Sequence, residues 1–578
     1  MKKTKKLLML LTACVLTFST CLAKTEPTKA NAATKVKNIK AAVTTKTNSQ
    51  TYAESMQPGW NLGNSFDSVG STGETSWGNP VVTQQLIQTI KSQGFKSIRI
   101  PFTAYGRVGA APNYTIDSTY LTRYAQVVQW ALDQGLYVMI NIHHDSWEWA
   151  EYINADDDNG VSMTEYKAIW TQLANYFKSY SSKVCFESLN EPYFKNHSGD
   201  VSTDIQMQRL SAVNTQFRTI VRNSGGNNTS RMLVLPTLNT NNSDDRCTSL
   251  YNTISGFNDP YIMATFHYYG YWPFSVNIAG TTTFDSTTIS DLTSSFDRVY
   301  NHFTANGIGV VTGEYGLLAF DSSSSAIEHG ELLKYFDYIN YYAKSKGIAL
   351  MLWDNGNLLN RTSYTWNDQA LYNTLKASWT SRNSYSTSDM LFVKYADRTK
   401  DISMNLTLNG NTLSSIYNGS TKLVLGTDYT YSNGIVTLKG SYVNKFISGS
   451  YGTKATLTMK FSAGVDWNVF LNYYTTPVLS SATGTTSGFN IPVAFNGSKL
   501  STLEAVYSDG SGAGPQNWTT YKQYSDAYTA NYSTNVVTLT SNFFSACNDG
   551  VITLKLHFQS GEIIQYNITK SGTSVKSN

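Results

Sequence analysis

The sequence predicts an α/β protein in which a (β/α)8 TIM barrel is followed by two small all-β sandwich modules. Two patterns support this fold class. Between Pro58 and Gly356, short runs rich in β-forming residues alternate with longer segments of helical period, and after Trp379 the long helical segments disappear. A chain of 578 residues is also too long for one hydrophobic core, so two or three domains are expected.

Eight short runs provide the predicted barrel strands. Between them lie helical candidates such as 121–135 and 164–180, where apolar residues recur at intervals of three and four. Polar and aromatic residues cluster directly after the runs, and in barrels of this kind the loops after the strands build the active site. The eight runs are 59–64, 97–101, 137–144, 184–191, 232–236, 262–269, 309–314 and 348–353.

Two glutamates close apolar runs that are predicted to be buried parallel strands. They are Glu191, in Ser-Leu-Asn-Glu-Pro, and Glu314, in Val-Thr-Gly-Glu-Tyr-Gly, and a barrel brings both to the same rim. Cleavage of an acetal needs one carboxylic acid to protonate the leaving oxygen and a second carboxylate, about 5–5.5 Å away when it attacks the sugar carbon itself. Either glutamate alone could be a salt-bridge partner at the rim. Together they indicate a glycosidase.

The last third of the chain predicts two modules built from hairpins. A polar linker precedes the first module, which ends near Tyr474, and Asn-Gly pairs mark the turns between its alternating strands. The second module has the same character. Representative strands are 402–408 and 455–461 in the first module, and 536–539 and 551–558 in the second.

The N-terminus resembles a secretory signal, with a lysine-rich start, an apolar stretch and the small residues of Ala30-Asn31-Ala32. A lipid anchor at Cys21 is the minor alternative. Removal of residues 1–32 takes away six lysines and one glutamate, which changes the formal charge from +4 to −1 and argues against a nucleic-acid binder.

The predicted segments are a signal peptide (1–32), an N-terminal linker (33–50), a catalytic barrel (51–380), a linker (381–388), and modules at 389–475 and 476–578.

Three cysteines remain after that cleavage, Cys185, Cys247 and Cys547. They have neither the spacing of a metal site nor an even number for a disulfide framework. Packed cores must therefore stabilise the domains.

Seven motifs occur along the barrel in the order in which family 5 glycoside hydrolases of the cellulase type carry them, and the chain resembles that family. They are Gly59-Trp60-Asn61-Leu62-Gly63-Asn64, Ile98-Arg99-Ile100-Pro101, Asn141-Ile142-His143-His144-Asp145, Leu189-Asn190-Glu191-Pro192, His267-Tyr268-Tyr269, Gly313-Glu314-Tyr315-Gly316 and Trp353-Asp354.

The resemblance implies that Glu191 is the general acid/base and Glu314 the nucleophile of a retaining double displacement. Arg99 would hold Glu314 ionised, although a barrel-core ion pair is its alternative role. Asn190 resembles the family asparagine that binds the sugar 2-hydroxyl, and a turn-forming asparagine before proline is the alternative.

His143, His267 and Tyr269 match the residues that orient substrate and glutamates in the family, with Tyr269 donating to Glu314. Lone histidines are usually core residues, so this assignment depends on the motif. A zinc site made of His143, His144 and His267 is conceivable. Because the glutamate pair explains these residues without a metal, neither a metal nor a cofactor is expected.

Aromatic residues make up 13% of the chain, and flat rings are surfaces on which sugars stack. By resemblance, Trp353 is the platform nearest the cleaved bond, and His144 also lines the cleft. Four further tryptophans are candidate cleft walls that could equally be loop packing. They are Trp77, Trp147, Trp149 and Trp272.

The two C-terminal modules also have family resemblances. Residues from about 389 to 463 resemble the immunoglobulin-like X2 module of bacterial cellulases, which would serve as a spacer. The last module resembles carbohydrate-binding family 46, which in similar tri-modular enzymes folds back to extend the cleft. Trp518 is therefore a candidate glucan contact, with a buried structural tryptophan as the alternative.

These observations predict a secreted, monomeric, retaining endo-β-1,4-glucanase that acts on cellulose or related β-glucans, with xyloglucan and mixed-linkage glucan as further substrates. No nucleic acid and, after signal cleavage, no membrane is expected as a partner. A β-mannanase of the same fold is one alternative, because contact with the 2-hydroxyl decides between the two. A catalytically silent polysaccharide-binding protein is the other. Activity should be bell-shaped in pH, with the upper limb set by Glu191.

Overall fold

The computed structural model describes residues 45–321 and 326–578. The predicted signal peptide, 1–32, and most of the predicted linker 33–50 lie outside the described residues. In the described part of the chain, no helix combines the length and the apolar character needed to cross a membrane. The three cysteines expected to remain, at 185, 247 and 547, are free thiols.

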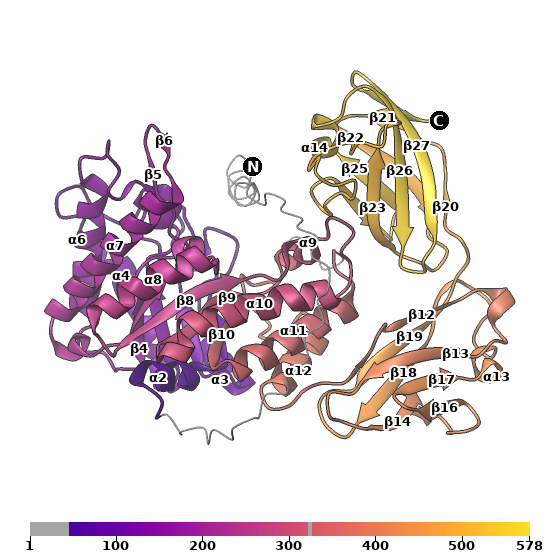
Figure 1. The fold of residues 1–578 in the computed structure, drawn as a ribbon, viewed down its shortest axis with the longest axis horizontal. Coiled ribbons are helices and arrows are strands. Elements are labelled where there is room, and N and C mark those ends of the chain that lie inside the picture. Colours follow the sequence, from indigo (N-terminus) through magenta and orange to yellow (C-terminus); the bar gives the residue numbers. More distant parts are fainter. Residues whose placement is uncertain (1–44, 322–325) are drawn as a thin grey trace, which may run out of the picture. The chain divides into compact units, whose positions relative to one another are not determined.

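A closed barrel of eight parallel strands confirms the predicted fold class (Figure 1). Its strand order is β1-β10-β9-β8-β7-β4-β3-β2, so consecutive barrel strands are neighbours all the way round. All eight predicted runs contribute one strand each. The strands are β1 (Gly59–Asn61), β2 (Ser97–Ile100), β3 (Tyr137–Asn141), β4 (Val184–Glu187), β7 (Leu233–Pro236), β8 (Ile262–Tyr268), β9 (Gly309–Tyr315) and β10 (Ile348–Leu352).

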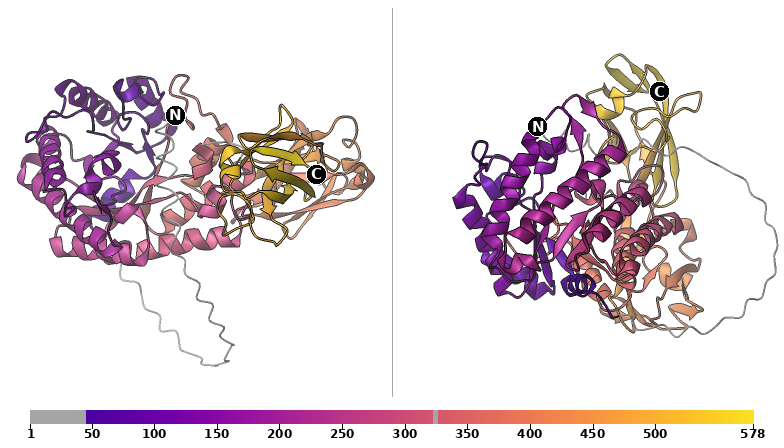
Figure 2. Two further views of the ribbon diagram at one scale, coloured as in Figure 1. Left: turned by 90° about the horizontal axis from the view of Figure 1, so that it is seen from above. Right: turned by 60° about the vertical axis from the view of Figure 1, so that its left-hand side comes forward.

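Helices surround the strands, as the views in Figures 1 and 2 show. The helix over 118–133 starts three residues before the predicted segment. Asp117 caps it, because its side chain accepts hydrogen bonds from the backbone N–H groups of Thr119 and Tyr120. The helices are α2 (Asn48–Met56), α3 (Gln84–Gln93), α4 (Ser118–Asp133), α5 (Asp145–Glu148), α6 (Val161–Phe177), α7 (Thr203–Asn223), α8 (Asp244–Phe257), α9 (Trp272–Ser275), α10 (Ser286–His302), α11 (His329–Ser345) and α12 (Gln369–Ser378), and a small hairpin pairs β5 (Lys195–Asn196) with β6 (Gly199–Asp200).

The inside of the barrel is divided into an apolar and a polar part. The apolar part packs against Ala53 and Met56 of α2, and the polar part lies toward the carboxyl ends of the strands. The side chains of both parts are buried and fill the barrel as a core. The apolar side chains include Met139, Cys185, Val234, Met263, Val311 and Met351, and the polar ones include Asn61, Arg99, Asn141 and Glu187.

The first C-terminal module contains two sheets, ordered β11-β13-β17-β16 and β12-β19-β18-β14-β15. The predicted polar linker 381–388 is in part a strand, because Tyr385 and Ser386 pair with Thr407 and Leu406. The strands are β11 (Tyr385–Ser386), β12 (Met390–Val393), β13 (Ile402–Thr407), β14 (Leu413–Asn418), β15 (Thr421–Lys422), β16 (Tyr429–Ser432), β17 (Ile435–Leu438), β18 (Gly452–Phe461) and β19 (Trp467–Tyr473), with the short helix α13 (Gly440–Val443).

The second module is built from antiparallel strands along the path β23-β26-β27-β28-β21-β22-β25-β24, with β20 paired to β22. The strands are β20 (Val478–Leu479), β21 (Thr483–Thr485), β22 (Gly488–Ala494), β23 (Leu500–Val506), β24 (Tyr528–Asn531), β25 (Val536–Thr540), β26 (Gly550–Phe558), β27 (Ile563–Ser571) and β28 (Ser574–Ser577), with the helix α14 (Ser541–Ser545).

Hydrogen bonds connect the barrel with both modules, and Lys46–Asn578 forms one compact unit. Lys334 of α11 donates to the carbonyl of Thr387 at 2.7 Å. The side-chain amide of Asn277, in the loop after α9, donates to the carbonyl of Ser501 at 2.9 Å.

The packing of α2 against β9 gives a test of the fold. A Cβ atom on Gly309 would collide with the backbone carbonyl of Ser49, so Gly309→Ala should lower the free energy of unfolding by about 1–3 kcal/mol. Gly256→Ala is the matched control, because nothing lies within 4 Å of that Cβ position in α8 and alanine favours a helix. Calorimetric melting of wild type and both variants measures the change in unfolding free energy. Equal melting temperatures of the barrel transition would contradict the packing.

Candidate active site

Glu191 and Glu314 meet at the carboxyl ends of the barrel strands. Glu314 belongs to β9 itself, and Glu191 follows the end of β4 by four residues. One carboxylate oxygen of each, together with a ring nitrogen of His267, lies within 4.8 Å of the others. The Glu314 side chain is 6% exposed and the Glu191 side chain 39%, so Glu314 is enclosed and Glu191 is partly open to solvent.

The backbone of Glu191 has a φ of +39°, a left-handed conformation that is unusual for a residue with a side chain. The residue that follows is Pro192, which restricts the backbone of the residue before it. Such strained residues concentrate at functional sites, where the surrounding structure holds them.

Arg99 is the centre of the site's hydrogen-bond network. Its Nη1 donates to Glu314 Oε1 at 2.7 Å, and its Nη2 donates to Asn190 Oδ1 at 2.8 Å. Its Nε donates to Glu187 Oε2 at 2.7 Å. Nη1 also donates to Asn61 Oδ1 at 3.1 Å. The guanidinium is fully buried, so these bonds fix its plane and thereby the position of both Glu314 and Asn190.

The second oxygen of Glu314 and the carboxylate of Glu191 have their own partners. The hydroxyl of Tyr269 donates to Glu314 Oε2 at 2.6 Å. His267 Nδ1 lies 2.8 Å from Glu191 Oε1 and 3.6 Å from Glu314 Oε2. His267 therefore stands between the two carboxylates. His143 Nε2 lies 3.9 Å from Glu314 Oε1, on the side of Arg99.

The two histidines have opposite electrostatic surroundings. Burial lowers the pKa of His143 well below its ordinary value, and the neighbouring positive groups lower it further. Burial would also lower the pKa of His267, but the carboxylates of Glu314 and Glu191 raise it above the ordinary value. His143 is therefore the neutral member of the pair, and His267 keeps a second proton to higher pH.

Glu191 and His267 share a titratable proton. Burial favours the neutral carboxyl of Glu191, yet the hydrogen bond and the charge of His267 lower its pKa below the ordinary value. The two groups therefore titrate as a pair, in which a charged His267 and an ionised Glu191 favour each other. Transfer across the 2.8 Å hydrogen bond would protonate Glu191 without changing the charge of the pair.

Arg99 carries a stable charge. Burial opposes that charge, but the carboxylates of Glu187 and Glu314 raise the pKa of the guanidinium above its usual value. The group thus stays positive at any pH at which the protein is folded.

Several aromatic rings lie next to His143 and His144, beside the glutamates. Trp353 lies parallel to the His143 ring, with the ring centres 5.9 Å apart and 4° between the planes. His144 stacks on Trp147 at 4.1 Å and contacts Trp77 at 4.9 Å, and its ring nitrogen lies 3.4 Å from Asp67.

The remaining candidate tryptophans differ in their surroundings. Trp149 is only 9% exposed, and its indole N–H donates to Asp145, which fits the alternative of loop packing rather than a cleft wall. Trp518 is 53% exposed and is therefore not a buried structural tryptophan. Its ring centre lies 6.1 Å from that of Trp272 in α9, so the last module brings an aromatic side chain to the barrel.

Sequence reasoning missed the buried polar residues beneath the glutamates. Asn61 and Asn141 lie in motifs that were recognised, but no role followed from the motifs. Glu187 closes the strand β4, and the signal that could have found it is a carboxylate inside an otherwise apolar run.

Two groups of described side chains could bring metal ligands together. Asp67, His143 and His144 form one, and Glu191, His267 and Glu314 form the other. The second group is the glutamate pair itself, and its histidine is already hydrogen-bonded to a carboxylate. The expectation that no metal is needed stays a prediction.

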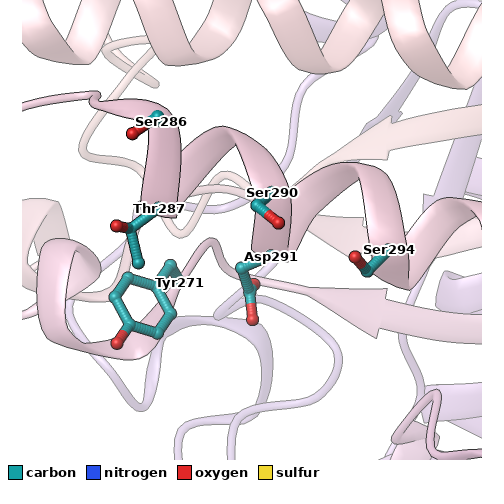
Figure 3. A pocket seen from close by; sticks show the side chains of 6 residues that line it. All are labelled: Tyr271, Ser286, Thr287, Ser290, Asp291 and Ser294. Atoms are coloured by element: carbon teal, nitrogen blue, oxygen red, sulfur yellow. The ribbon is translucent and has the colours of Figure 1, made fainter. Parts of the chain in front are cut away.

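A separate pocket of about 460 Å³ lies along α10 (Figure 3). Four hydroxyl side chains of α10 line it together with Asp291 and Tyr271, and Asp291 accepts a hydrogen bond from Tyr268 at 2.8 Å. None of the glutamates or histidines described above lines this pocket, so it is distinct from the rim site.

Comparison with known families gives three matches. Residues 62–358 match the cellulase family, described as glycosyl hydrolase family 5. Residues 385–471 match the carbohydrate binding domain X2, and residues 475–578 match the carbohydrate binding domain CBM46.

Individual proteins resemble the chain over most of its length. Endoglucanase B of Paenibacillus lautus is 51% identical over 527 residues, which are 91% of this chain and 93% of that protein. The structure of the full-length tri-modular endo-β-1,4-glucanase B of Bacillus halodurans superposes with a TM-score of 0.89 at 46% identity, over 92% of this chain and 99% of that one. A tri-modular endo-β-1,4-glucanase of Bacillus licheniformis, solved with cellotetraose, gives a TM-score of 0.77 at 29% identity, over 90% of this chain and 99% of that one.

The opposite surroundings of the two histidines predict separate titrations. The imidazole of His267 should lose its second proton above the ordinary pKa of histidine, because two carboxylates stabilise the charged ring, and His143 should stay neutral down to acidic pH. Nitrogen-15 NMR of labelled histidine across the pH range measures this, with His267→Gln and His143→Gln to assign the signals. Titration of His143 at or above the pH of His267 would contradict the electrostatics.

Proposed function

This chain belongs to the cellulase family, glycosyl hydrolase family 5, and we propose that it hydrolyses internal β-1,4-glucosidic bonds of cellulose and related β-glucans with retention of the anomeric configuration. The observation that carries the proposal is the approach of the Glu191 and Glu314 oxygens to within 4.8 Å. Retaining glycosidases hold their carboxyl groups about 5–5.5 Å apart, whereas inverting ones need about 6.5–9.5 Å to admit a water molecule.

In the first step, a carboxylate oxygen of Glu314 attacks the anomeric carbon. Arg99 and Tyr269 hold that carboxylate with one hydrogen bond to each oxygen, which orients it for attack. Glu191 gives its proton to the leaving oxygen as the bond breaks. His267 can pass that proton to Glu191 across their hydrogen bond. The pair then holds one proton in addition to the N–H proton of a neutral imidazole.

In the second step, Glu191 acts as a base. It is ionised after giving up its proton, and it takes a proton from the water that attacks the glycosyl ester on Glu314. The greater exposure of Glu191 suits this role, because the leaving sugar and the water both approach from the cleft.

Asn190 is suited to bind the sugar 2-hydroxyl. Because its side-chain oxygen accepts from Arg99, the orientation of the amide is fixed, and its NH₂ group can donate to a hydroxyl. A hydrogen bond at this position strengthens as the oxocarbenium-like transition state forms.

The aromatic side chains supply the surfaces for the glucan. Trp353 is the proposed platform next to the cleaved bond, and Trp147 and His144 continue the cleft on one side. Trp272 and Trp518 are the proposed contacts on the side of the last module.

Xyloglucan and mixed-linkage glucan are proposed as additional substrates. The related proteins named above are endoglucanases, and no observation favours a mannanase or a silent binding protein.

The same proposal covers the organisation of the chain. We place a catalytic barrel at 51–380, an X2 spacer at 389–475 and a carbohydrate-binding module at 476–578, with a signal peptide at 1–32 directing secretion of a monomer. A polymer substrate that does not enter cells supports an extracellular site of action.

The proposal is tested by hydrolysis assays on carboxymethylcellulose, xyloglucan and mannan. Wild-type protein should lower the viscosity of the first two polymers, and Glu314→Gln should lose at least about 10³-fold in kcat because the amide cannot attack carbon. Trp77→Ala, which changes an aromatic residue without a role in the chemistry, is the matched control and should alter KM more than kcat. Preferential cleavage of mannan, or full activity of Glu314→Gln, would contradict the proposal.

A further inference from the structure

Glu187 is a fully buried carboxylate that the proposed reaction does not use. It is the last residue of β4, and its Oε2 accepts from Arg99 Nε at 2.7 Å and from Asn141 Nδ2 at 2.9 Å. Its Oε1 has no hydrogen-bond partner among the described residues. Burying a charge in this way is costly, and a neutral residue of similar size would avoid that cost. The presence of a carboxylate here therefore indicates that its charge has a role.

Asn141 connects Glu187 to His143, because its amide nitrogen hydrogen-bonds both side chains. The backbone N–H of Phe102 donates to Asn141 Oδ1 at 3.2 Å, which turns the amide nitrogen toward Glu187 and toward His143 Nδ1 at 3.1 Å. His143 Nδ1 is thereby the acceptor, and its proton lies on Nε2, the nitrogen that faces Glu314. Glu187 thus orients two of the groups that surround the nucleophile.

The charges around Arg99 change during the proposed first step. Before attack, one guanidinium stands between two carboxylates, Glu187 and Glu314. An oxygen of Glu314 then supplies the electron pair for the new bond to C1, the bond from C1 to the leaving oxygen breaks, and its electron pair stays on that oxygen, which takes the proton of Glu191. The ester is neutral. If Glu314 were the only counter-ion of Arg99, a buried guanidinium would then be left without one.

We propose that Glu187 is a positioning residue that serves as the permanent counter-ion of Arg99 and so stabilises the glycosyl-enzyme intermediate. The inference rests on the proposed retaining function. Its distinctive consequence is a difference between the two steps. Loss of the Glu187 charge opposes the formation of the ester, which removes the charge of Glu314, and does not oppose the breakdown of the ester, which restores that charge.

The test uses 2,4-dinitrophenyl 2-deoxy-2-fluoro-β-cellobioside, which releases dinitrophenolate and leaves a slowly hydrolysed ester on the nucleophile. Glu187→Gln keeps the size of the side chain and an oxygen for Arg99 but removes the charge. Labelling of this variant should be about 100-fold slower than labelling of wild type. Its reactivation with cellobiose should proceed at the wild-type rate or faster.

A merely structural role for Glu187 predicts another result, because a misplaced nucleophile slows both steps. Labelling of Glu187→Gln within threefold of wild type, or reactivation slowed in proportion to labelling, overturns the inference. Asp259→Asn is the matched control. It neutralises a buried carboxylate that pairs with Arg218 and Arg222 away from the site, and both of its rates should equal those of wild type.

Two further measurements keep the outcome interpretable. Should Glu187→Gln fail to fold in a melting experiment, Glu187→Asp replaces it. This variant keeps the charge and must label within tenfold of wild type, and a larger loss overturns the inference. Peptide mass mapping of labelled wild type must find the sugar on Glu314. Failure of wild type to become labelled refutes the proposed function, whereas failure of the predicted difference between variants refutes only the role of Glu187.

Discussion

The site depends on one buried guanidinium and on the requirement that its charge be compensated. Arg99, in β2, holds Glu314 and Asn61 through Nη1, Asn190 through Nη2 and Glu187 through Nε. A single planar group thus sets the relative positions of residues on or after β1, β4 and β9. The planar fork of arginine makes this possible, and the point charge of a lysine would not. The closed barrel supplies the rest, because it brings β1, β2, β4 and β9 around a common interior.

The two glutamates differ because their surroundings differ. Glu314 is enclosed and held by Arg99 and Tyr269, whereas Glu191 is partly exposed, has a strained backbone and lies in hydrogen-bond contact with His267. This difference in surroundings supports the separate acid/base and nucleophile roles that we propose for the two carboxyl groups. Each group shifts the pKa of the other, downward for Glu191 and upward for His267, so we expect the upper limb of activity to depend on the pair and not on Glu191 alone.

The sequence predicted the barrel well because its strands carry distinct apolar runs and because the motifs after them occur in barrel order. It also indicated Glu191, Glu314, Arg99 and Tyr269, which the structure brings together. Glu187 escaped prediction because its partner Arg99 is 88 residues away, and only the closed barrel shows that both side chains point inward. Trp147 and Trp149 could not be distinguished either, since the turn around α5 sends one ring to His144 and the other to Asp145.

We propose that the two carboxylates act on one sugar from opposite sides through a covalent intermediate. The decisive experiment is proton NMR of the anomeric signals during the first minutes of cellotetraose hydrolysis. The newly formed reducing ends should appear first as the β-anomer and then mutarotate. Initial release of the α-anomer would mean inversion by a water molecule, and the mechanism built on Arg99, Glu191 and Glu314 would be wrong.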